Sequence, residues 1–276
     1  MKKLQSLQLS TDPYEDLRNK LAILSVRASL KECFQEFGEN AYSISESIGV
    51  FKQMDFSAKV TGLPPPYFYG SSQVPSWFLN EYISMSQITR QNECCIWLYV
   101  ENSVESKILS SLNGALDEGY VLGYPDCCIK WYEEMWRKQI EVLYQYILHR
   151  YNLKDQCEII GKLRFSNAQD FAHLFLQIFT DVNLEKTVRT FPFVFHIACK
   201  NCLENSKSPT ALVNKQNKRL ALNLDHNFYK RIEDLSNEYT LNVKQRSASQ
   251  KSDFYFLKNQ FPWLSDLLKI ADFNPF

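Results

Sequence analysis

The chain has 276 residues, of which 45% are hydrophobic and 14% aromatic, and its 31 basic and 31 acidic side chains give a formal net charge of zero. This composition is typical of a globular protein that buries a core without disulfide staples. Zero net charge removes the bulk electrostatic reason to bind nucleic acid. No apolar run approaches the roughly 20 residues that span a bilayer, and the first residues lack the apolar core of a secretory signal. We therefore expect a cytoplasmic protein with no membrane partner, and we do not expect nucleic-acid binding.

Residues 1–92 are expected to form a helical region that contains a loop rich in proline and aromatic residues. Asp12 and Pro13 fit a helix cap followed by a first-turn proline. Apolar positions then recur at helical spacing, so a helix is predicted to run to about Phe37. Consecutive prolines forbid helix within residues 62–78, where we predict an extended segment that covers the core or serves as a lid or partner-binding loop.

Residues 93–276 are expected to form a second helical region that carries the metal site, or to continue the first as one domain. An apolar run predicts a strand over about 93–101. Helices are predicted over five ranges: 104–119, 126–151, 167–181, 209–235 and 250–271. The polar tract 244–251 is predicted to be a mobile linker or loop. The expected fold class is mainly α, with a small β element and a Cys/His metal site between helix N-termini.

Two clusters of cysteines dominate the sequence. The first is the vicinal pair Cys127 and Cys128, which ends the string Leu-Gly-Tyr-Pro-Asp-Cys-Cys, and the second is His196-x-x-Cys199-x-x-Cys202. Thiolate and neutral imidazole are the ligands that zinc and iron–sulfur clusters take. Both clusters lie near predicted helix N-termini, where free amides and the helix dipole favour a thiolate. All five side chains are therefore candidate metal ligands.

The identity of the centre depends on how these ligands are shared. His196, Cys199, Cys202 and one of the vicinal pair would make a closed tetrahedral zinc site. The three cysteines could instead hold a 4Fe–4S cluster, with the histidine on the fourth iron or that iron open to a substrate. The aromatic surroundings suit a cluster that needs protection from water, so iron–sulfur is the preferred cofactor and zinc the alternative. Adjacent side chains diverge on a helix, so only one of Cys127 and Cys128 is expected to bind, and periodicity favours Cys128.

The other polar candidates near these clusters have less specific signals. Asp126 is expected to be a helix cap or a general acid, and His196 a metal ligand or an acid–base group. Eight cysteines without an export signal are expected to be reduced thiols. The four thiols outside the clusters are predicted to pack as small hydrophobes: Cys33, Cys94, Cys95 and Cys157. For the adjacent pair among them, a place near the metal is the alternative.

The string Leu122–Cys128, with the downstream His/Cys segment, resembles a poorly characterised archaeal and bacterial family. Members of that family carry a Gly-Tyr-Pro-x-Cys-Cys signature and a later His-x-Pro-Cys segment with another cysteine. The resemblance covers about residues 104–224, and Ala198 stands here in place of the family's proline. It implies a shared cysteine and histidine site, and it implies no particular reaction.

The function expected from these residues is that of a metalloenzyme. It would depend on an iron–sulfur cluster and act on a small molecule or peptide in a biosynthetic or modification step, with the cluster as Lewis acid or electron relay. One alternative is a zinc-stabilised interaction module without catalysis. A second alternative is a thiol redox protein, because a Cys-x-x-Cys segment before a helix is also an oxidoreductase geometry.

Overall fold

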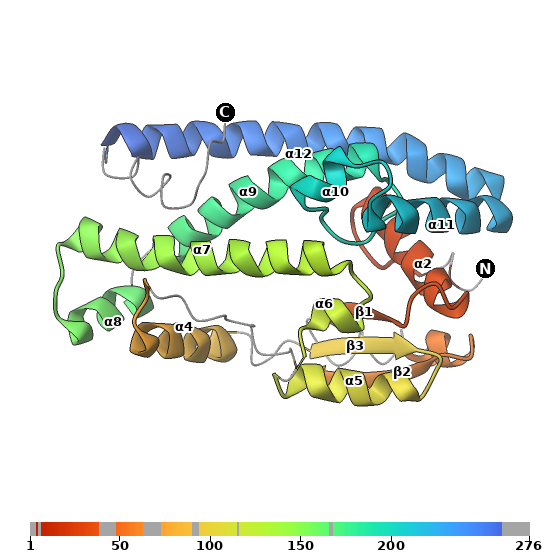
Figure 1. Ribbon diagram of the computed structural model, residues 1–276, viewed down its shortest axis with the longest axis horizontal. Helices are drawn as coiled ribbons and strands as arrows, with labels where there is room; N and C mark the ends of the chain where they lie inside the picture. Colours follow the sequence, from red (N-terminus) through yellow and green to blue (C-terminus); the bar gives the residue numbers. More distant parts are fainter. Residues whose placement is uncertain are drawn as a thin grey trace. The chain divides into compact units, whose positions relative to one another are not determined.

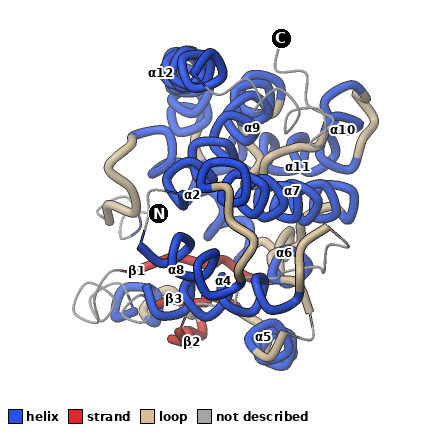
Figure 2. Tube along the Cα trace, turned by 90° about the vertical axis from the view of Figure 1, so that its left-hand side faces the viewer, coloured by secondary structure: helices blue, strands red, loops and turns tan. Residues whose placement is uncertain are grey.

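Most of the described residues are helical, which agrees with the mainly α fold class predicted from the sequence. The computed structural model describes residue 4 and residues 7–38, 48–62, 73–89, 94–114, 116–165 and 168–260 (Figure 1). Strands are confined to one small three-stranded sheet, and the rest of the described chain is helix and connecting loop (Figure 2). The mainly α class with a small β element is confirmed. No helix in the described part of the chain is long and apolar enough to cross a membrane.

The chain divides into two compact units, each assembled from three separate segments. Unit 1 contains Met1–Pro65, Thr89–Ile129 and Lys186–Thr240. Unit 2 contains Pro66–Ile88, Lys130–Glu185 and Leu241–Phe276. All the candidate metal ligands belong to unit 1, so this unit contains the site.

A three-stranded antiparallel sheet lies in unit 1. Its strands are β1 (Cys33–Gly38), β2 (Ser57–Gly62) and β3 (Cys94–Tyr99), in the order β1-β3-β2 (Figure 1). Both outer strands pair with β3 along its whole length. The strand predicted over about 93–101 is therefore confirmed as the central strand, which agrees with its continuous apolar run.

The first described long helix, α2, ends earlier than its periodicity predicted. It spans Pro13–Arg27, and the Asp12 side chain caps it by accepting hydrogen bonds from the first-turn amides, 2.9 Å from that of Tyr14. The predicted extension to Phe37 is wrong. At Ser29 the backbone takes a positive φ of 54° and turns the chain, and the following residues form β1. Pairing with β3 satisfies their backbone groups, so tertiary context overrides the helical spacing.

The two faces of β3 bury different sets of side chains. Ile96 and Leu98 pack in a core that includes apolar residues of α2, such as Ile23. Trp97 lies in a second core with residues of α5 (Ser103–Leu112) and of the short helix α6. The sheet is thus covered by helices on both faces, and α6 is anchored to one of them. Because α6 comes just before the turn that leads to Cys127 and Cys128, this packing fixes the position of the first cysteine cluster.

The turn between α6 (Glu118–Val121) and α7 (Asp126–Tyr151) depends on two glycines. Gly123 has a positive φ of 70°, which a glycine adopts without strain. Gly119 is buried, and a Cβ added there would lie 2.9 Å from Cγ1 of Ile129. The close approach of α6 to the first turn of α7 therefore requires glycine. The helix predicted over 126–151 is confirmed with the same bounds.

After the second cysteine cluster, the chain forms α11 (Pro209–Leu224) and α12 (His226–Gln260). The helix predicted over 209–235 is therefore interrupted. Asp225 stands between the two helices in an extended conformation, and its carboxylate accepts a hydrogen bond of 2.7 Å from the backbone N–H of Asn227. Capping by this side chain starts a new helix where the sequence pattern alone suggested continuation.

The polar tract 244–251, predicted to be a mobile linker, lies inside α12 and is helical. Arg246 explains part of the difference, because its guanidinium donates two hydrogen bonds to the Asp181 carboxylate, at 2.7 and 2.8 Å. Gln250 donates to the side chain of Gln177 at 3.0 Å. These polar contacts within unit 2 support a helix that carries few apolar residues. The part of the predicted helix 250–271 that follows residue 260 lies outside the described residues.

Unit 2 is helical in its described part. It includes α4 (Ser76–Thr89), α8 (Gln156–Phe165) and parts of α7, α9 (Ala168–Thr190) and α12. Its core joins residues of α4, α7 and α8, among them the fully buried Phe78, Leu143 and Leu163. Helices α4 and α8 were not predicted from the sequence. Because α4 begins at Ser76, the end of the predicted 62–78 loop is helical, whereas residues 63–72 lie outside the described residues.

Replacing Gly119 by alanine should destabilise the protein. The added methyl would overlap the Ile129 side chain, and overpacking of this kind costs about 1–3 kcal/mol. Gly161→Ala in α8 is the matched control, because a Cβ there meets no atom within 4 Å and alanine favours a helix interior by about 1 kcal/mol. Urea unfolding of the full chain should shift in opposite directions for the two variants. Equal shifts would contradict the packing described for α6.

Candidate metal centre

Four cysteine side chains from two distant segments converge in unit 1. The Sγ atoms of Cys127, Cys128, Cys199 and Cys202 all lie within 4.8 Å of one another. Two of the separations are shorter, 3.4 Å from Cys127 to Cys202 and 3.7 Å from Cys128 to Cys202. Cys127 is half-buried and the other three are buried, and all four are free thiols. Such a group can hold a metal ion.

Both vicinal cysteines point into this group, so the expectation that they would diverge is wrong. The pair lies in the first turn of α7, where side chains reach past the end of the helix as well as sideways. Cys199 immediately precedes the short helix α10 (Lys200–Glu204), which contains Cys202. The backbone N–H of Cys199 donates to Sγ of Cys128 at 3.4 Å. The segment that carries Cys199 and Cys202 therefore lies against the N-terminal end of α7. In this position it is close to the sulfurs of both Cys127 and Cys128.

The segment 191–199, which leads into Cys199, has neither helix nor strand and is largely buried. Side chains satisfy its backbone. The N–H of Phe193 donates to Asn214 at 3.0 Å and its carbonyl accepts from Asn217 at 2.9 Å. The N–H of Ala198 donates to Thr187 Oγ1 at 2.9 Å. Buried backbone groups require such partners. These hydrogen bonds therefore fix the backbone of segment 191–199 and, with it, the position of Cys199.

Thr210 connects the thiols to His196. It is fully buried near the start of α11, and its Oγ1 lies 3.5 Å from Sγ of Cys128 and 3.0 Å from Nε2 of His196. This contact was not predicted from the sequence. The sequence contains only an indirect signal for it. Ser208 and Pro209 predicted the start of a helix just after the second cluster, and Thr210 lies in the first turn of that helix.

His196 is buried beside the thiols but is not one of the converging group. Its Nε2 is hydrogen-bonded to Thr210 Oγ1, and the metal-ligand group found among the described residues consists of the four cysteines. Burial, reinforced by the positive charges of Lys31 and Arg18, lowers the pKa of His196 to about 3. Asp126 is exposed at the start of α7. The ligand role of His196 and the acid–base roles of His196 and Asp126 stay predictions.

The thiols differ in how readily they lose a proton. Burial raises the pKa of Cys127 to about 11, and it raises the pKa of Cys128 further. Burial also raises the pKa of Cys202, but hydrogen bonds from Thr210, Cys127 and Cys128 outweigh it and lower that pKa to about 7. Cys202 therefore ionises before Cys127 and Cys128. A cation that binds all four must displace the remaining protons, so its affinity should rise with pH.

The remaining cysteines lie outside this group. Cys33 and Cys95 are buried in the core between the sheet and α5, as predicted. Cys94 is half-buried. Cys157 is exposed in α8, so its predicted packing in the core is wrong; it falls in the first turn of a helix that the sequence pattern did not indicate.

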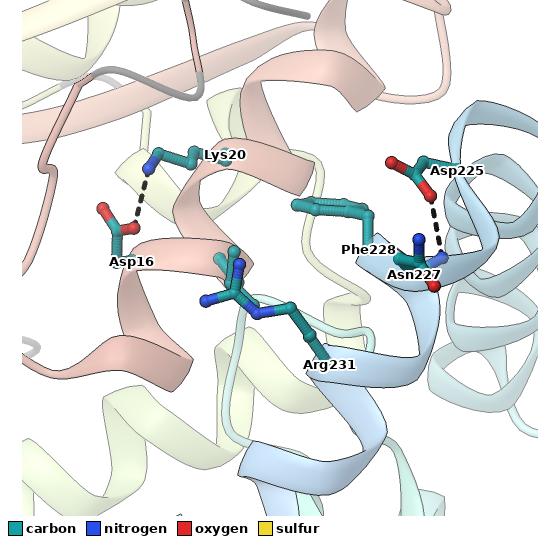
Figure 3. A pocket seen from close by; sticks show the side chains of 7 residues that line it. Asp16, Lys20, Asp225, Asn227, Phe228 and Arg231 are labelled. Atoms are coloured by element: carbon teal, nitrogen blue, oxygen red, sulfur yellow. Dashed lines mark hydrogen bonds and ion pairs between the residues drawn. The ribbon is translucent and has the colours of Figure 1, made fainter.

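Unit 1 also contains a cavity of about 510 Å³ between α2 and the start of α12. Figure 3 shows Asp16 and Lys20 paired on one wall, with Arg231 extending from α12 toward α2. Arg231 forms no ion pair or hydrogen bond with any described residue. The cavity is lined by Asp16, Leu17, Lys20, Asp225, Asn227, Phe228 and Arg231, so none of the candidate metal ligands faces it.

Comparison of the chain with protein-family models, with curated proteins and with solved structures found no match. The resemblance of the Leu122–Cys128 string to an archaeal and bacterial family stays a prediction. The function of the chain must therefore be inferred from the geometry and chemistry of the site itself.

Replacing Thr210 by valine should destabilise the protein, whereas Thr210→Ser should be much milder. Valine keeps the shape but removes the hydroxyl and leaves Nε2 of the buried His196 without its partner, which costs about 1–3 kcal/mol. Serine keeps the hydrogen bond and loses one methyl group. The free energy of unfolding of the full chain, measured in urea with a chelator present, should separate the two variants. Equal losses would show that the hydroxyl contributes little.

His196 should remain neutral well below the usual pKa of histidine. Because burial lowers its folded-state pKa to about 3, the unfolded chain binds a proton below about pH 6.5 that the folded chain does not. The contribution of this residue to stability is therefore fully present above pH 6.5 and is lost as pH falls toward the folded-state pKa. Imidazole ¹⁵N shifts, assigned with His196→Gln, should show the neutral form of His196 at pH 5. A protonated imidazole at that pH would contradict the burial of this side chain.

Proposed function

We propose that the four cysteines bind a single zinc ion and that this ion has a structural role in unit 1. The observation that carries the proposal is the mutual distance of the sulfurs, all within 4.8 Å. Four thiolates at about 2.3 Å from one tetrahedral ion lie about 3.8 Å apart. The measured separations of 3.4 and 3.7 Å are close to this value. A small contraction of the remaining pairs would complete a tetrahedron.

The same distances argue against the iron–sulfur cluster that the sequence favoured. In a 4Fe–4S cluster each thiolate binds a different iron at a separate corner of a cube. The ligand sulfurs are then spread more widely than around one ion. A site with four cysteines within 4.8 Å of one another would have to open to admit the cube, and three of the four side chains are buried.

The donor set also favours a structural role over a catalytic one. Four-coordinate zinc sites with only protein ligands are characteristically structural, whereas catalytic sites keep a position for water or substrate. Here four thiols are available, and the N–H of Cys199 and the hydroxyl of Thr210 lie against Cys128 Sγ. Such donors offset the negative charge that four thiolates and one zinc ion carry together.

The resulting function is that of a zinc-stabilised binding module, in which the ion fastens the start of α7 to the segment before α11. The first cluster lies in the first turn of α7, just after a turn, and the second follows segment 191–199, which has neither helix nor strand. A cross-link here would restrict the unfolded chain strongly, because it closes a long loop between the clusters.

Metal analysis of the full chain, purified without oxygen, tests the proposal. We expect one zinc per chain, no acid-labile sulfide and no visible absorption. Replacing the zinc by cobalt should give the intense bands of tetrahedral thiolate coordination. Iron with sulfide would overturn the proposal in favour of an iron–sulfur enzyme, and metal-free protein with a reversible Cys127–Cys202 disulfide would favour thiol redox chemistry.

Cysteine variants then test the ligand set. Replacing Cys127, Cys128, Cys199 or Cys202 singly by serine should lower zinc affinity and the melting temperature, and Cys157→Ser should change neither because that thiol is exposed and outside the group. A chelator should destabilise the wild type by about 4 kcal/mol if free zinc had been a thousand times its dissociation constant. Retention of one tightly bound zinc by Cys128→Ser or Cys202→Ser would rule out the four-thiol site.

A further inference from the structure

Lys31, in the turn between α2 and β1, has an unusual environment. Its ammonium lies 5.0 Å from the ring centroid of Tyr124 and 5.2 Å from that of Phe195. These are cation–π distances. Beyond the two rings, the ammonium makes no hydrogen bond or ion pair with any described residue. Ring faces attract the charge but accept none of its three N–H donors in the usual way, so these donors lack acceptors in the described part of the chain.

Arg18 of α2 adds a second cation with an unused donor. Its guanidinium lies 5.8 Å from the ring centroid of Tyr14, with which it also interacts as a hydrogen-bond donor. Its Nε is buried and has no hydrogen-bond partner among the described residues. Buried polar atoms without partners are uncommon in native proteins, and a bound water, ion or ligand is one explanation for such an atom.

The two positive charges act on each other and on His196, and neither forms an ion pair with a carboxylate of the described chain. The pKa of Lys31 is lowered to about 8, first by burial and then by repulsion from Arg18, although Cys33 acts in the opposite direction. Cys33 cannot serve as a counter-ion near neutral pH, because burial raises its pKa to about 12. The adjacent acid, Glu32, is bound through both oxygens to Lys107. Like charges repel each other, and an anion bound by both would offset this repulsion.

We propose that Arg18 and Lys31 bind an oxyanion, the phosphate or carboxylate group of a small ligand, beside the rings of Tyr124 and Phe195. The anion would accept hydrogen bonds from Nε of Arg18 and from the ammonium of Lys31. Charge-assisted bonds of this type are among the stronger ones that proteins form. The rings would exclude water from one side of the site.

The rings belong to the two segments that carry the cysteines. Tyr124 precedes Cys127 in the turn before α7, and Phe195 lies in segment 191–199. The Tyr124 hydroxyl donates to the Phe195 carbonyl at 3.3 Å, and the Tyr124 ring lies 5.1 Å from that of His196. The proposed zinc site would thus hold the walls of the anion site in place. The anion proposal itself depends only on the cations and rings, whatever ion the cysteines bind.

Titration of the full chain with inorganic phosphate tests this proposal, with sodium chloride keeping the ionic strength constant. Phosphate should raise the melting temperature and shift the side-chain ¹⁵N signals of Lys31 and Arg18 in the wild-type protein. Lys31→Met and Arg18→Gln should each weaken phosphate binding about tenfold or more, the loss typical of a hydrogen bond between charged groups. Lys31→Arg, which keeps the charge, should retain most of the affinity.

Two control variants separate this site from general electrostatic attraction. Arg231→Gln removes from the cavity in Figure 3 a cation that likewise has no ion-pair partner among the described residues. Lys130→Met removes an exposed lysine. Neither should change phosphate affinity. The metal content and unliganded melting temperature of every variant show whether the protein has folded, and the wild-type ¹⁵N titration decides the question even where Lys31→Met does not fold.

A titration with acetate in place of phosphate shows whether the site prefers a carboxylate or a phosphate group. Tighter binding of either one at Lys31 supports the proposal and identifies the ligand group. The proposal is overturned if chloride produces the same shifts as phosphate and acetate. It is also overturned if only Arg231→Gln weakens binding, or if phosphate leaves the Lys31 signals unchanged. Each of these outcomes is independent of the zinc measurements, so the two proposals can fail separately.

Discussion

The candidate site depends on how segment 191–199 is held, because this segment delivers Cys199 and Cys202 to the end of α7. It lacks regular secondary structure, and its buried backbone is satisfied by Asn214 and Asn217 of α11 and by Thr187 of α9. Asn217 also accepts a hydrogen bond from Ser25 of α2 at 3.0 Å. A loop in this position would be costly without these partners. The polar side chains of the surrounding helices are therefore as important to the site as the thiols themselves.

The same arrangement links two kinds of chemistry in unit 1. Four sulfurs within 4.8 Å of one another form a group that could hold a metal ion. The two cations Lys31 and Arg18 have N–H donors that no described residue accepts, and their charges act on His196. His196, neutral because of burial and of those cations, is hydrogen-bonded to Thr210, and its ring lies tilted against that of Tyr124. It therefore forms part of the wall between the two proposed sites. An ion that stiffens this wall would also fix the geometry of any ligand bound beyond it.

The sequence correctly predicted those elements whose structure depends mainly on the preferences of neighbouring residues. The strand over 93–101 and the helix over 126–151 were predicted because apolar runs and periodicity are sufficient there, and Asp12 and Pro13 marked the start of α2. The failures occurred where distant partners overrule local preference. The extension to Phe37 became β1 because β3 required a neighbour, and the polar tract 244–251 stayed helical through contacts of Arg246 and Gln250 with α9. An isolated segment carries no information about such partners.

The sequence by itself indicated a site rich in thiols and named five candidate ligands, the four cysteines of the two clusters and His196, because residue type and spacing specify soft ligands near helix starts. Only the tertiary structure decided that both members of the vicinal pair face the same point and that His196 bonds to Thr210. It also decided that the sulfurs lie close enough for one ion. The physical reason is that ligand geometry depends on the direction from which the second segment meets α7, and this direction is set by buried hydrogen bonds between residues far apart in the chain.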